Sequence, residues 1–441
     1  MMSKSPNIVF CHVDQLTWDA VSAHGCRDVS TPNMDRIFSD GVDFRRAQST
    51  YPVCCPNRSA WYTGRFPSEN GVVVNGQPLD DKIPDLGQWL SARGYECCYG
   101  GKWHIPNRDV RRSFWYYHGR HSLGEFMDDS LAQATEALLE NRSDSRPLFL
   151  NVGFMNPHDI CYLDIHKQTA CKLGLEQQIG NRLPALPEDY DPDREIMFSQ
   201  VASDWTPQQV ALYRYYYFRM TEMVDVQIGR VYDAVFKYLD PDNTVFIFSS
   251  DHGEMNGHRN WFHKNILYDP SLRVPLAVVA PGRIRAGTVD HTHIVGGVDF
   301  AATILDYAGA EKLPGMHHAR SFRMLAETGD DPDWHDYVIA ESFYSLGPQR
   351  SVRSGDFKSI YYLAEDRAEL YNTAIDPLEQ NNLQDDPSYV EVRKKHEQFK
   401  DDFERTNPLC KTWEVALRTN PYQWCASDYK KKMTAQWKNG N

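Results

Sequence analysis

Runs of apolar residues alternate with helical patterns along this chain, and most of the runs end at polar or glycine-rich residues. Strand-length apolar runs occur at residues 8–13, 95–99, 146–154, 244–249 and 276–280. Apolar positions recur with helical spacing at residues 84–93, 207–239 and 298–308. Alternating strands and helices of this kind predict an α/β fold with a large mixed, mainly parallel sheet sandwiched by helices.

The pattern changes near residue 313. Shorter strands are expected at residues 337–341, 349–353, 358–362 and 369–372, followed by a charged helix at 389–405. We therefore expect a large α/β domain at residues 1–330, a smaller C-terminal subdomain with an antiparallel sheet at 331–405, and a tail at 406–441. The tail is rich in Trp, Tyr and Lys and has no pattern of its own. It either packs on its own chain or wraps a neighbouring subunit of a homo-oligomer.

Three segments have weaker patterns. Residues 72–74 are expected to form a short strand, and Asn75 after them is either a turn residue or part of a site. Residues 108–126 combine Arg and His with aromatic residues and form either a solvated loop or a substrate-recognition loop. Residues 160–205 are irregular and rich in Pro, Asp and Gln, which indicates an insertion over the active-site face.

Composition and charge exclude several classes of protein. The 441 residues are 41% hydrophobic and 24% charged, as in an ordinary soluble enzyme. The 47 basic and 60 acidic residues give a net charge of −13, which disfavours non-specific binding to nucleic acid or membranes. No apolar stretch has the length of a membrane span.

The N-terminus and the cysteines bear on the compartment. The first residues run directly into a strand without the pattern of a signal peptide, so we expect a cytoplasmic protein, or a periplasmic one if a signal was removed. The ten cysteines include no Cys-x-x-Cys spacing, which disfavours a zinc ribbon and a disulfide framework.

The stretch TYPVCCPNRSAWYTGRFPSENG, residues 50–71, has the features of an anion pocket. Pro56 fixes one backbone angle, and residues 59–63 after it can begin a helix. Cys54 would then face the free N–H groups of a helix start, which attract anions. Arg58 lies one turn further on and can point back to the same place. A nucleophile, an arginine and a helix N-terminus together predict an oxyanion pocket.

Polar residues follow several predicted strands. Asp14 ends the first of them and Asp251-His252 follows another, and ligands gather at the carboxyl ends of strands in α/β sheets. Asp14 alone is equally a metal ligand or an ordinary turn residue. Lys102 and His104, after two glycines, alternate onto one side of an extended segment. His158 follows a further strand, where a loop histidine often has no special role.

These residues match the sequence motifs of a known family. Cys54, Pro56, Arg58 and the Thr-Gly-Arg at 63–65 form C-x-P-x-R-x-x-x-x-T-G-R, which resembles the signature of the type I, formylglycine-dependent sulfatases of the alkaline phosphatase superfamily. Gly-Lys-Trp-His, Pro-His, and Asp-His-Gly with a later Lys-x-x-x-Tyr resemble further sulfatase motifs in the same order. The resemblance spans roughly residues 5–385 and implies hydrolysis of sulfate monoesters.

The resemblance also implies roles for single residues. Cys54 would be oxidised to formylglycine by a formylglycine-generating enzyme, and the hydrated aldehyde would attack sulfur. Lys102 and Lys264 would bind the sulfate oxygens, and His104 would take a proton from the second hydroxyl to release sulfate. His158 would contact the bridging oxygen of the ester, and His158 or Lys264 would protonate the leaving alcohol.

The implied metal ligands are residue 54 together with Asp14, Gln15, Asp251 and His252. Gln15 departs from the family pattern, since an acidic residue usually follows the first aspartate. One divalent cation is expected, with Ca²⁺ favoured and Mn²⁺ admitted by the imidazole and the neutral amide.

Two alternatives to a sulfatase stay open. The Asp-Gln and Asp-His pairs also occur in phosphonate monoester hydrolases, which makes a phosphonate monoester or a phosphodiester the second substrate class. A non-enzymatic anion-binding protein, in which Cys54 is never converted, would keep Arg58 and Lys102. For a sulfatase, a sulfated saccharide, a choline-like ester and an aryl sulfate all fit the sequence equally well.

Overall fold

The structure is a computed structural model that describes residues 5–119, 122–163, 174–193, 205–343 and 347–407. Within these residues the main sheet has the strand order β4-β3-β5-β1-β6-β7-β2-β8. Its strands are β1 (Asn7–Asp14), β2 (Val42–Phe44), β3 (Glu96–Gly101), β4 (Trp115–His118), β5 (Leu148–Pro157), β6 (Thr244–Ser250), β7 (Leu276–Val279) and β8 (Thr288–Asp290). β1 is parallel to both its neighbours, whereas β7 is antiparallel to β6 and to β2. The predicted mixed, mainly parallel sheet is confirmed.

The side chains of β1 alternate between two hydrophobic cores. Ile8 and Phe10 belong to one core, and Val9, Cys11 and Val13 belong to the other. Successive side chains of a strand point to opposite faces, so a strand that is apolar at every position must be covered on both sides. β1 is buried on both faces at the centre of the sheet, so its last residue, Asp14, lies at the middle of one edge of the sheet.

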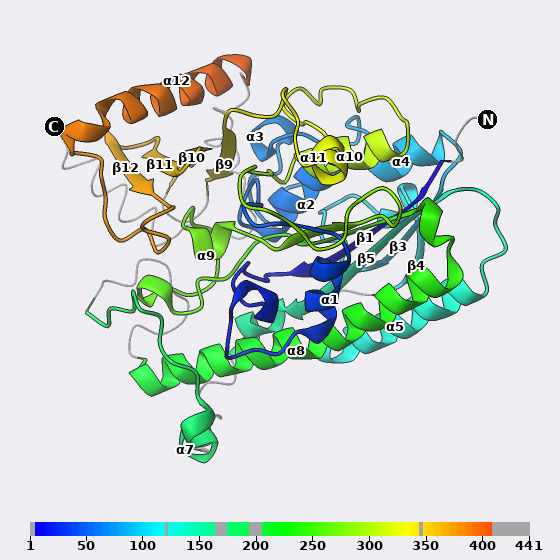
Figure 1. The fold of residues 1–441 in the computed structure, drawn as a ribbon, viewed down its shortest axis with the longest axis horizontal. Helices are drawn as coiled ribbons and strands as arrows, with labels where there is room; N and C mark the ends of the chain where they lie inside the picture. The colour runs from blue at the N-terminus through cyan, green and yellow to red at the C-terminus, as the bar shows by residue number, and fades with distance from the viewer. Residues whose placement is uncertain (1–4, 120–121, 164–173, 194–204, 344–346, 408–441) are drawn as a thin grey trace.

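Helices cover both faces of the main sheet (Figure 1). One layer contains α1 (Pro32–Asp40), α5 (Gly124–Glu140) and α8 (Pro207–Tyr238). The other contains α2 (Cys54–Thr63), α3 (Pro67–Asn70), α4 (Leu86–Ser91), α10 (Asp299–Tyr307) and α11 (Arg323–Thr328). The short helices α7 (Leu175–Ile179) and α9 (Asp269–Leu272) lie outside these layers. This sandwich leaves the carboxyl ends of β1, β3, β5 and β6 as the edge that carries polar residues.

A smaller antiparallel sheet follows in the chain, as predicted. Its strand order is β12-β11-β10-β9, and α12 (Val390–Thr406) packs on it. The strands are β9 (Val338–Ser342), β10 (Gln349–Ser354), β11 (Phe357–Tyr362) and β12 (Arg367–Asn372). The tail after residue 407, with the predicted contact to a neighbouring subunit, lies outside the described residues.

A buried ion cluster joins the small sheet to α9. Asp269, the first residue of α9, accepts a hydrogen bond from Nζ of Lys358 at 2.6 Å and also pairs with Arg353. Nζ of Lys358 donates to the carbonyl of Leu267 at 2.8 Å, and Glu379 accepts from the N–H of Asp269 at 2.7 Å. Burial raises the pKa of Asp269, but Arg353 and Lys358 outweigh it and hold that pKa well below its usual range.

Three local predictions were wrong. Residues 72–74 form no strand; their valines are buried in an irregular segment, and apolar runs alone do not separate these two cases. The helix expected after Pro56 begins earlier, at Cys54, because proline is tolerated in a first turn whose N–H groups lack helical partners. Residues 108–126 include β4 and the start of α5, so only part of this segment is a loop.

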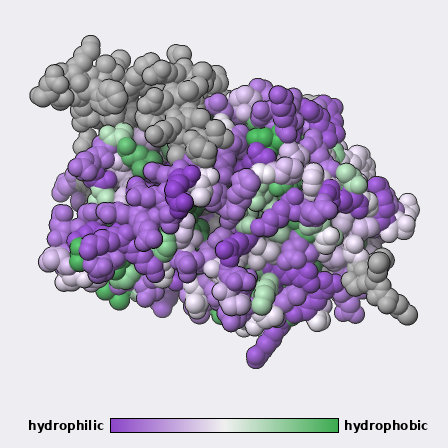
Figure 2. Space-filling model, turned by 90° about the horizontal axis from the view of Figure 1, so that it is seen from above, coloured by the Kyte–Doolittle hydropathy of each residue, from purple (hydrophilic) through white to green (hydrophobic). Residues whose placement is uncertain are grey.

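The predicted insertion is described in part. Between residues 160 and 205 the structure describes the end of a 3₁₀ helix (His158–Tyr162), α7 and a second 3₁₀ helix (Gly180–Arg182). None of the helices described for this chain is long and apolar enough to cross a membrane. The face shown in Figure 2 is mostly hydrophilic, with hydrophobic side chains in small separate groups.

Candidate active site

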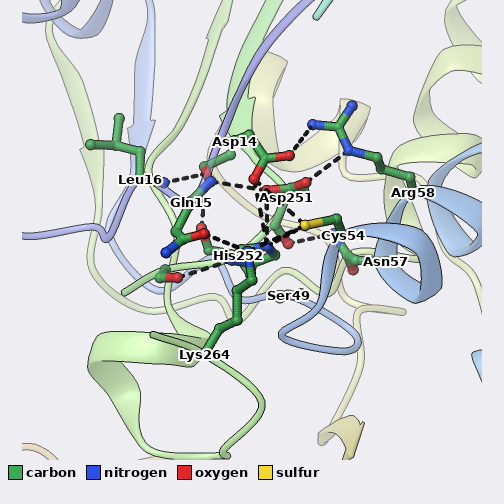
Figure 3. A network of polar contacts seen from close by, with 12 residues as sticks. Asp14, Gln15, Leu16, Ser49, Cys54, Asn57, Arg58, Asp251, His252 and Lys264 are labelled. Carbon is green, nitrogen blue, oxygen red and sulfur yellow. Dashed lines mark hydrogen bonds and ion pairs between the residues drawn. The ribbon is translucent and has the colours of Figure 1, made fainter. Parts of the chain in front are cut away.

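Cys54 is the first residue of α2, and Val53 before it is extended. The N–H of Cys55 donates to Oδ1 of Asn75 at 3.1 Å, so a side chain from another segment satisfies one of the free amides of the first turn. Asn75 therefore supports the start of α2, next to the proposed nucleophile. The side chain of Cys54 points to the ends of β1 and β6 (Figure 3).

Four buried side chains offer metal-binding atoms to one point: Asp14, Cys54, Asp251 and His252. These atoms all lie within 4.8 Å of one another. Nε2 of His252 lies 3.1 Å from Sγ of Cys54, and Nδ1 lies 2.9 Å from the carbonyl oxygen of Gly253. In the neutral ring, donation from Nδ1 to that carbonyl leaves Nε2 as an acceptor that faces the cluster. Without a cation, burial lowers the pKa of the ring, but the nearby Asp251 outweighs burial and raises that pKa. Two carboxylates and an imidazole are donors that suit a divalent cation.

Arg58 connects both carboxylates of this cluster. Its Nε donates to Oδ2 of Asp251 at 2.8 Å, and a terminal nitrogen donates to Oδ2 of Asp14 at 3.0 Å. The other terminal nitrogen donates to the carbonyl of Lys102 at 2.7 Å. All these groups are fully buried, where charged hydrogen bonds are strong and a missing partner is costly. Arg58 thus fixes two elements of the site relative to α2.

Two lysines approach position 54 from different segments. Nζ of Lys102 lies 2.7 Å from Oδ2 of Asp14 and 4.0 Å from Sγ of Cys54. Nζ of Lys264 lies 3.4 Å from the same sulfur and donates to Oε1 of Gln15. Together with Arg58, the lysines surround position 54 with positive charge.

Gly101 is required for the position of Lys102. Its φ is +89°, and a Cβ there would lie 2.0 Å from the carbonyl oxygen of Gly153 on β5. Only glycine allows this close approach together with a left-handed backbone. The next residue, Lys102, donates its N–H to that carbonyl at 2.8 Å, and the chain then turns toward the site.

Gln15 turns back into the site directly after β1. Its φ is +71°, which is unusual for a residue other than glycine, and its N–H donates to Oδ1 of Asp251 at 3.1 Å. Nε2 of Gln15 donates to Oε2 of the buried Glu254 at 2.5 Å. The amide therefore has its donor end on a carboxylate and its acceptor end toward Lys264.

Two histidines complete the surroundings of Cys54. His158 directly follows Pro157, which pairs with Asp14 in the sheet. Burial, then Lys102 and Lys264, lower the pKa of His158 to about 3, although a hydrogen bond with Cys54 opposes them. Burial also lowers the pKa of His104, again against a hydrogen bond with Cys54. Both rings are within hydrogen-bonding reach of position 54 and are neutral near pH 7.

The surroundings change the ionisation of the Cys54 thiol. Burial and the charge of Asp14 raise its pKa, but Lys102, Lys264 and His252 outweigh them and hold it well below its usual range. By contrast, burial raises the pKa of the neighbouring Cys55 to about 12. The site stabilises a negative charge at position 54 specifically, as an anionic nucleophile or a bound anion requires.

The ten residues selected from the sequence lie in one cluster, although their roles stay predictions. They are Asp14, Gln15, Cys54, Arg58, Lys102, His104, His158, Asp251, His252 and Lys264. Asn57 was not predicted from the sequence; its Nδ2 donates to the carbonyl of Asp251 at 2.6 Å. Glu254 was not predicted either, although its place directly after Asp-His-Gly was a usable signal. A third residue, Asp128, accepts from the N–H of Met155 at 2.8 Å and lies on α5, a helix that was not predicted.

A hollow of about 460 Å³ lies where β4 ends and α5 begins. Its lining includes Tyr116, His118, Phe126 and Ser130. Nε2 of His118 lies 2.9 Å from Oγ of Ser130, and the hydroxyl of Tyr116 donates to the carbonyl of Gly101 at 3.2 Å. The hollow therefore adjoins the end of β3 that leads to Lys102 and His104.

Comparison of the chain with models of known protein families identifies its family. Residues 6–310 match the model of the family described as Sulfatase. The chain belongs to the sulfatase family. Residues 257–405 also match the model described as N-sulphoglucosamine sulphohydrolase, C-terminal. This sulfatase is therefore a sulfuric ester hydrolase of the alkaline phosphatase superfamily, and the predicted family and fold are confirmed.

Curated relatives of this sulfatase match over most of their length. The N-acetylglucosamine-6-O-sulfatase of Bacteroides thetaiotaomicron is 27% identical, over 89% of this chain and 85% of that protein. The Delta 4,5-hexuronate-2-O-sulfatase of the same organism is 28% identical, over 91% and 89%. The choline-sulfatase of Rhizobium meliloti is 27% identical, over 88% and 84%.

Solved structures show the same fold. A 2-O GAG sulfatase superposes with a TM-score of 0.80 at 25% identity, over 93% of this chain and 94% of that one. The phosphonate monoester hydrolase of Agrobacterium radiobacter superposes with a TM-score of 0.74 at 21% identity, over 91% and 96%. The second similarity concerns the fold alone.

Proposed function

We propose that this sulfatase hydrolyses sulfate monoesters of saccharides, with a formylglycine nucleophile made from Cys54 and one divalent cation. The observation that supports this best is the convergence on Sγ of Cys54. His252 approaches it to 3.1 Å, Lys264 to 3.4 Å and Asp14 to 3.6 Å. The candidate metal ligands and the lysine expected to bind sulfate thus converge on one residue, as a nucleophile at a metal demands.

The donor set fits a divalent cation. Burial, and then the charge of Asp14, raise the pKa of Asp251 to about 6, so this carboxylate is a group that a cation would stabilise. Asp14, Asp251, His252, Oε1 of Gln15 and residue 54 would hold the ion. Mostly oxygen donors favour Ca²⁺, whereas the imidazole also suits Mn²⁺. The ion would acidify the hydrated aldehyde of formylglycine and neutralise charge on the sulfate.

The cationic side chains of the protein allow the anionic substrate to approach an anionic nucleophile. Lys102 and Lys264 lie on two sides of position 54, where they bind the sulfate oxygens. Arg58 is committed to Asp14 and Asp251, so it holds the carboxylates in place and offsets their charge. Positive groups fixed before the substrate arrives need no reorganisation as negative charge shifts during the reaction.

His104 and His158 are placed for the two proton transfers of the reaction. His104, neutral in the free enzyme, accepts the proton of the second hydroxyl at position 54 as the sulfate leaves. His158 contacts the bridging oxygen of the ester, and the leaving alcohol takes its proton from Lys264, or from His158 after that ring has been protonated in the substrate complex. Both side chains reach position 54, as this step requires.

A saccharide is the alcohol that the relatives support. Two of them are named for sulfate on N-acetylglucosamine and on an unsaturated hexuronate. In this chain the hollow at the ends of β4 and α5 has aromatic walls from Tyr116 and Phe126, and aromatic faces stack on sugar rings. Its position beside the end of β3 gives room for the sugar units next to the sulfated one.

Mass spectrometry and paired assays test this proposal. The protein is produced with and without a formylglycine-generating enzyme, and the peptide that contains Cys54 is weighed. We expect an aldehyde at position 54 only with the maturation enzyme, together with turnover of a sulfated monosaccharide. Cys54→Ala should abolish turnover, whereas Cys55→Ala, a matched buried thiol, should keep it. An intact thiol in an active preparation would overturn the proposal.

A phosphonate monoester or a phosphodiester is the second candidate substrate. The neutral Gln15 at the cation site is the observation that favours it, because it makes the pocket less like that of a usual sulfatase. Parallel turnover of an aryl sulfate and an aryl phosphonate separates the two. We expect the sulfate to react faster; phosphonate cleavage faster by orders of magnitude would reverse the assignment.

A further inference from the structure

We infer that Glu254 is a positioning residue, which fixes the side-chain amide of Gln15 and is the reason that position 15 carries an amide instead of a carboxylate. The inference deepens the proposed function, because it explains how one ligand of the same cation site is set. It rests on a buried hydrogen-bond network that extends from Glu254 through Gln15 and Lys264 to Cys54.

Glu254 is held firmly in the loop after β6. Its Oε1 accepts from the hydroxyl of Tyr213 at 3.0 Å and from the backbone N–H groups of Asn256 at 3.0 Å and His263 at 2.6 Å. Its Oε2 accepts from Nε2 of Gln15 at 2.5 Å. The residue is fully buried, so both oxygens are satisfied by the protein. A carboxylate with these four donors cannot turn away from Gln15 without losing several charged hydrogen bonds.

This contact selects one orientation of the amide. A side-chain amide has one end that donates and one that accepts, whereas an ionised carboxylate only accepts. A flipped Gln15 would place Oε1 against Oε2 of Glu254, which is repulsive. Glu254 therefore keeps Nε2 on its own side and turns Oε1 toward Nζ of Lys264. Nζ of Lys264 in turn lies 3.4 Å from Sγ of Cys54, so the orientation is transmitted to the reacting position.

The same contact determines the charge at position 15. A glutamate there would place a second carboxylate at hydrogen-bonding distance from Glu254, in a pocket that already contains Asp14 and Asp251. Like charges at that distance and depth are strongly unfavourable. The negative charge of Glu254 thus lies on the side of the Gln15 amide that faces away from the cation site, and the amide and the carboxylate form one hydrogen-bonded pair. Exchange of the two groups, with glutamate at 15 and glutamine at 254, should keep this hydrogen bond and place the negative charge at the cation site.

The test is a double-mutant cycle with three variants: Gln15→Glu, Glu254→Gln and the exchanged pair Gln15→Glu/Glu254→Gln. Each is made in the Cys54→Ala background, where no turnover is needed. We measure urea unfolding and the titration of Ca²⁺ and of Mn²⁺ by calorimetry. We expect Gln15→Glu alone to raise the unfolding equilibrium constant, and the exchanged pair to recover at least about 10-fold of that loss. The exchanged pair should also bind Ca²⁺ more tightly relative to Mn²⁺ than the parent does.

Every outcome decides the inference. If Gln15→Glu does not fold but the exchanged pair does, the coupling is supported. If the two substitutions act independently, or the exchanged pair also fails to fold, the inference is wrong. Tyr213→Phe serves as the control, since it removes one hydrogen bond to Glu254 and keeps both charges; it should change the Ca²⁺ to Mn²⁺ ratio little. These measurements do not depend on turnover, so absence of sulfatase activity would count against the proposed function alone.

A kinetic measurement separates positioning from general stability. In the mature enzyme, Glu254→Gln leaves the amide of Gln15 free to flip, so Lys264 loses its fixed acceptor. We expect KM for an aryl sulfate to rise by about 10-fold or more, with a smaller fall in kcat, because sulfate binding depends on Lys264. Glu254→Asp keeps the charge and should recover part of the loss. Equal effects of both variants on KM would contradict a positioning role.

Discussion

Sγ of Cys54 lies 3.1 Å from Nε2 of His252, so the residue expected to become the nucleophile is also part of the candidate cation site. Asp14 and Asp251 complete the same cluster, within 4.8 Å. Arg58 and Lys102 are paired with the carboxylates as well, which means that the protein supplies part of the balancing charge itself. Binding of the cation should therefore stabilise the fold, but the fold should not depend on it.

Removal of the cation should inactivate the enzyme and leave it folded. Chelation would remove the cation that we propose acidifies the nucleophile, while Arg58 and Lys102 continue to hold the two carboxylates. We expect turnover to fall to background and the melting temperature to drop by several degrees, about the effect of 1–3 kcal/mol of lost ligand binding. Calorimetry after EDTA treatment, with Ca²⁺ or Mn²⁺ added back, measures both. Full activity in protein shown to be metal-free would contradict a catalytic cation.

Arg58→Lys should be damaging although it preserves the charge. A lysine cannot hold Asp14 and Asp251 at once, so at least one buried carboxylate loses its partner. We expect a loss of stability of about 3 kcal/mol and of activity by about 100-fold or more. Urea unfolding and steady-state kinetics provide the comparison. The matched control is Arg111→Lys, whose partner Asp109 is on the surface and whose change should have no measurable effect.

The proton donor to the leaving alcohol can be identified from a series of aryl sulfates. If His158 donates at the bridging oxygen, His158→Ala should slow esters of poor leaving groups by an extra factor of about 100. Lys264→Ala should slow all esters to a similar degree if Lys264 binds the sulfate, as we propose. The measurement is the slope of log kcat/KM against the pKa of the leaving phenol. A steeper slope for Lys264→Ala than for His158→Ala would assign the proton to Lys264.

Acid should destabilise the small sheet through His396. This buried ring on α12 contacts Oγ of Ser359 at 2.8 Å, and burial lowers its pKa from 6.5 to about 4. Between those values the unfolded state binds the proton and the folded state does not, so stability falls as pH drops from 6.5 toward 4. The full contribution is roughly 3 kcal/mol.

His396→Asn tests this dependence. Asparagine can keep a polar contact to Ser359 but has no proton to take up. Urea unfolding at about pH 7 and about pH 5 should show a smaller acid-induced loss for the variant than for the parent protein. Equal losses would show that other groups cause the acid sensitivity.

The sequence predicted most of the fold because its long apolar strands and the helix of α8 have clear periods. The strand predicted at residues 72–74 was wrong because buried loops and strands have the same apolar composition. α5 was missed for the opposite reason: it follows a segment of aromatic and charged residues that resembles a loop. In the site, the order of the sulfatase-like motifs along the chain identified the residues that surround position 54. Glu254 directly follows the Asp-His-Gly motif, but its partner Gln15 and the partner of Asp128 are distant in the sequence, and no single-sequence pattern records such pairs.

The ion cluster at Asp269 has a consequence for how this protein can be recombined. Lys358 and Arg353 of the small sheet hold α9, five residues after Lys264 in the chain. The two sheets therefore do not form interchangeable modules. A chimaera that takes the small sheet from another sulfatase must also carry matching partners for Asp269, or the loop with Lys264 loses its anchor. Grafts cut between the two sheets should thus fail more often than single substitutions on either side.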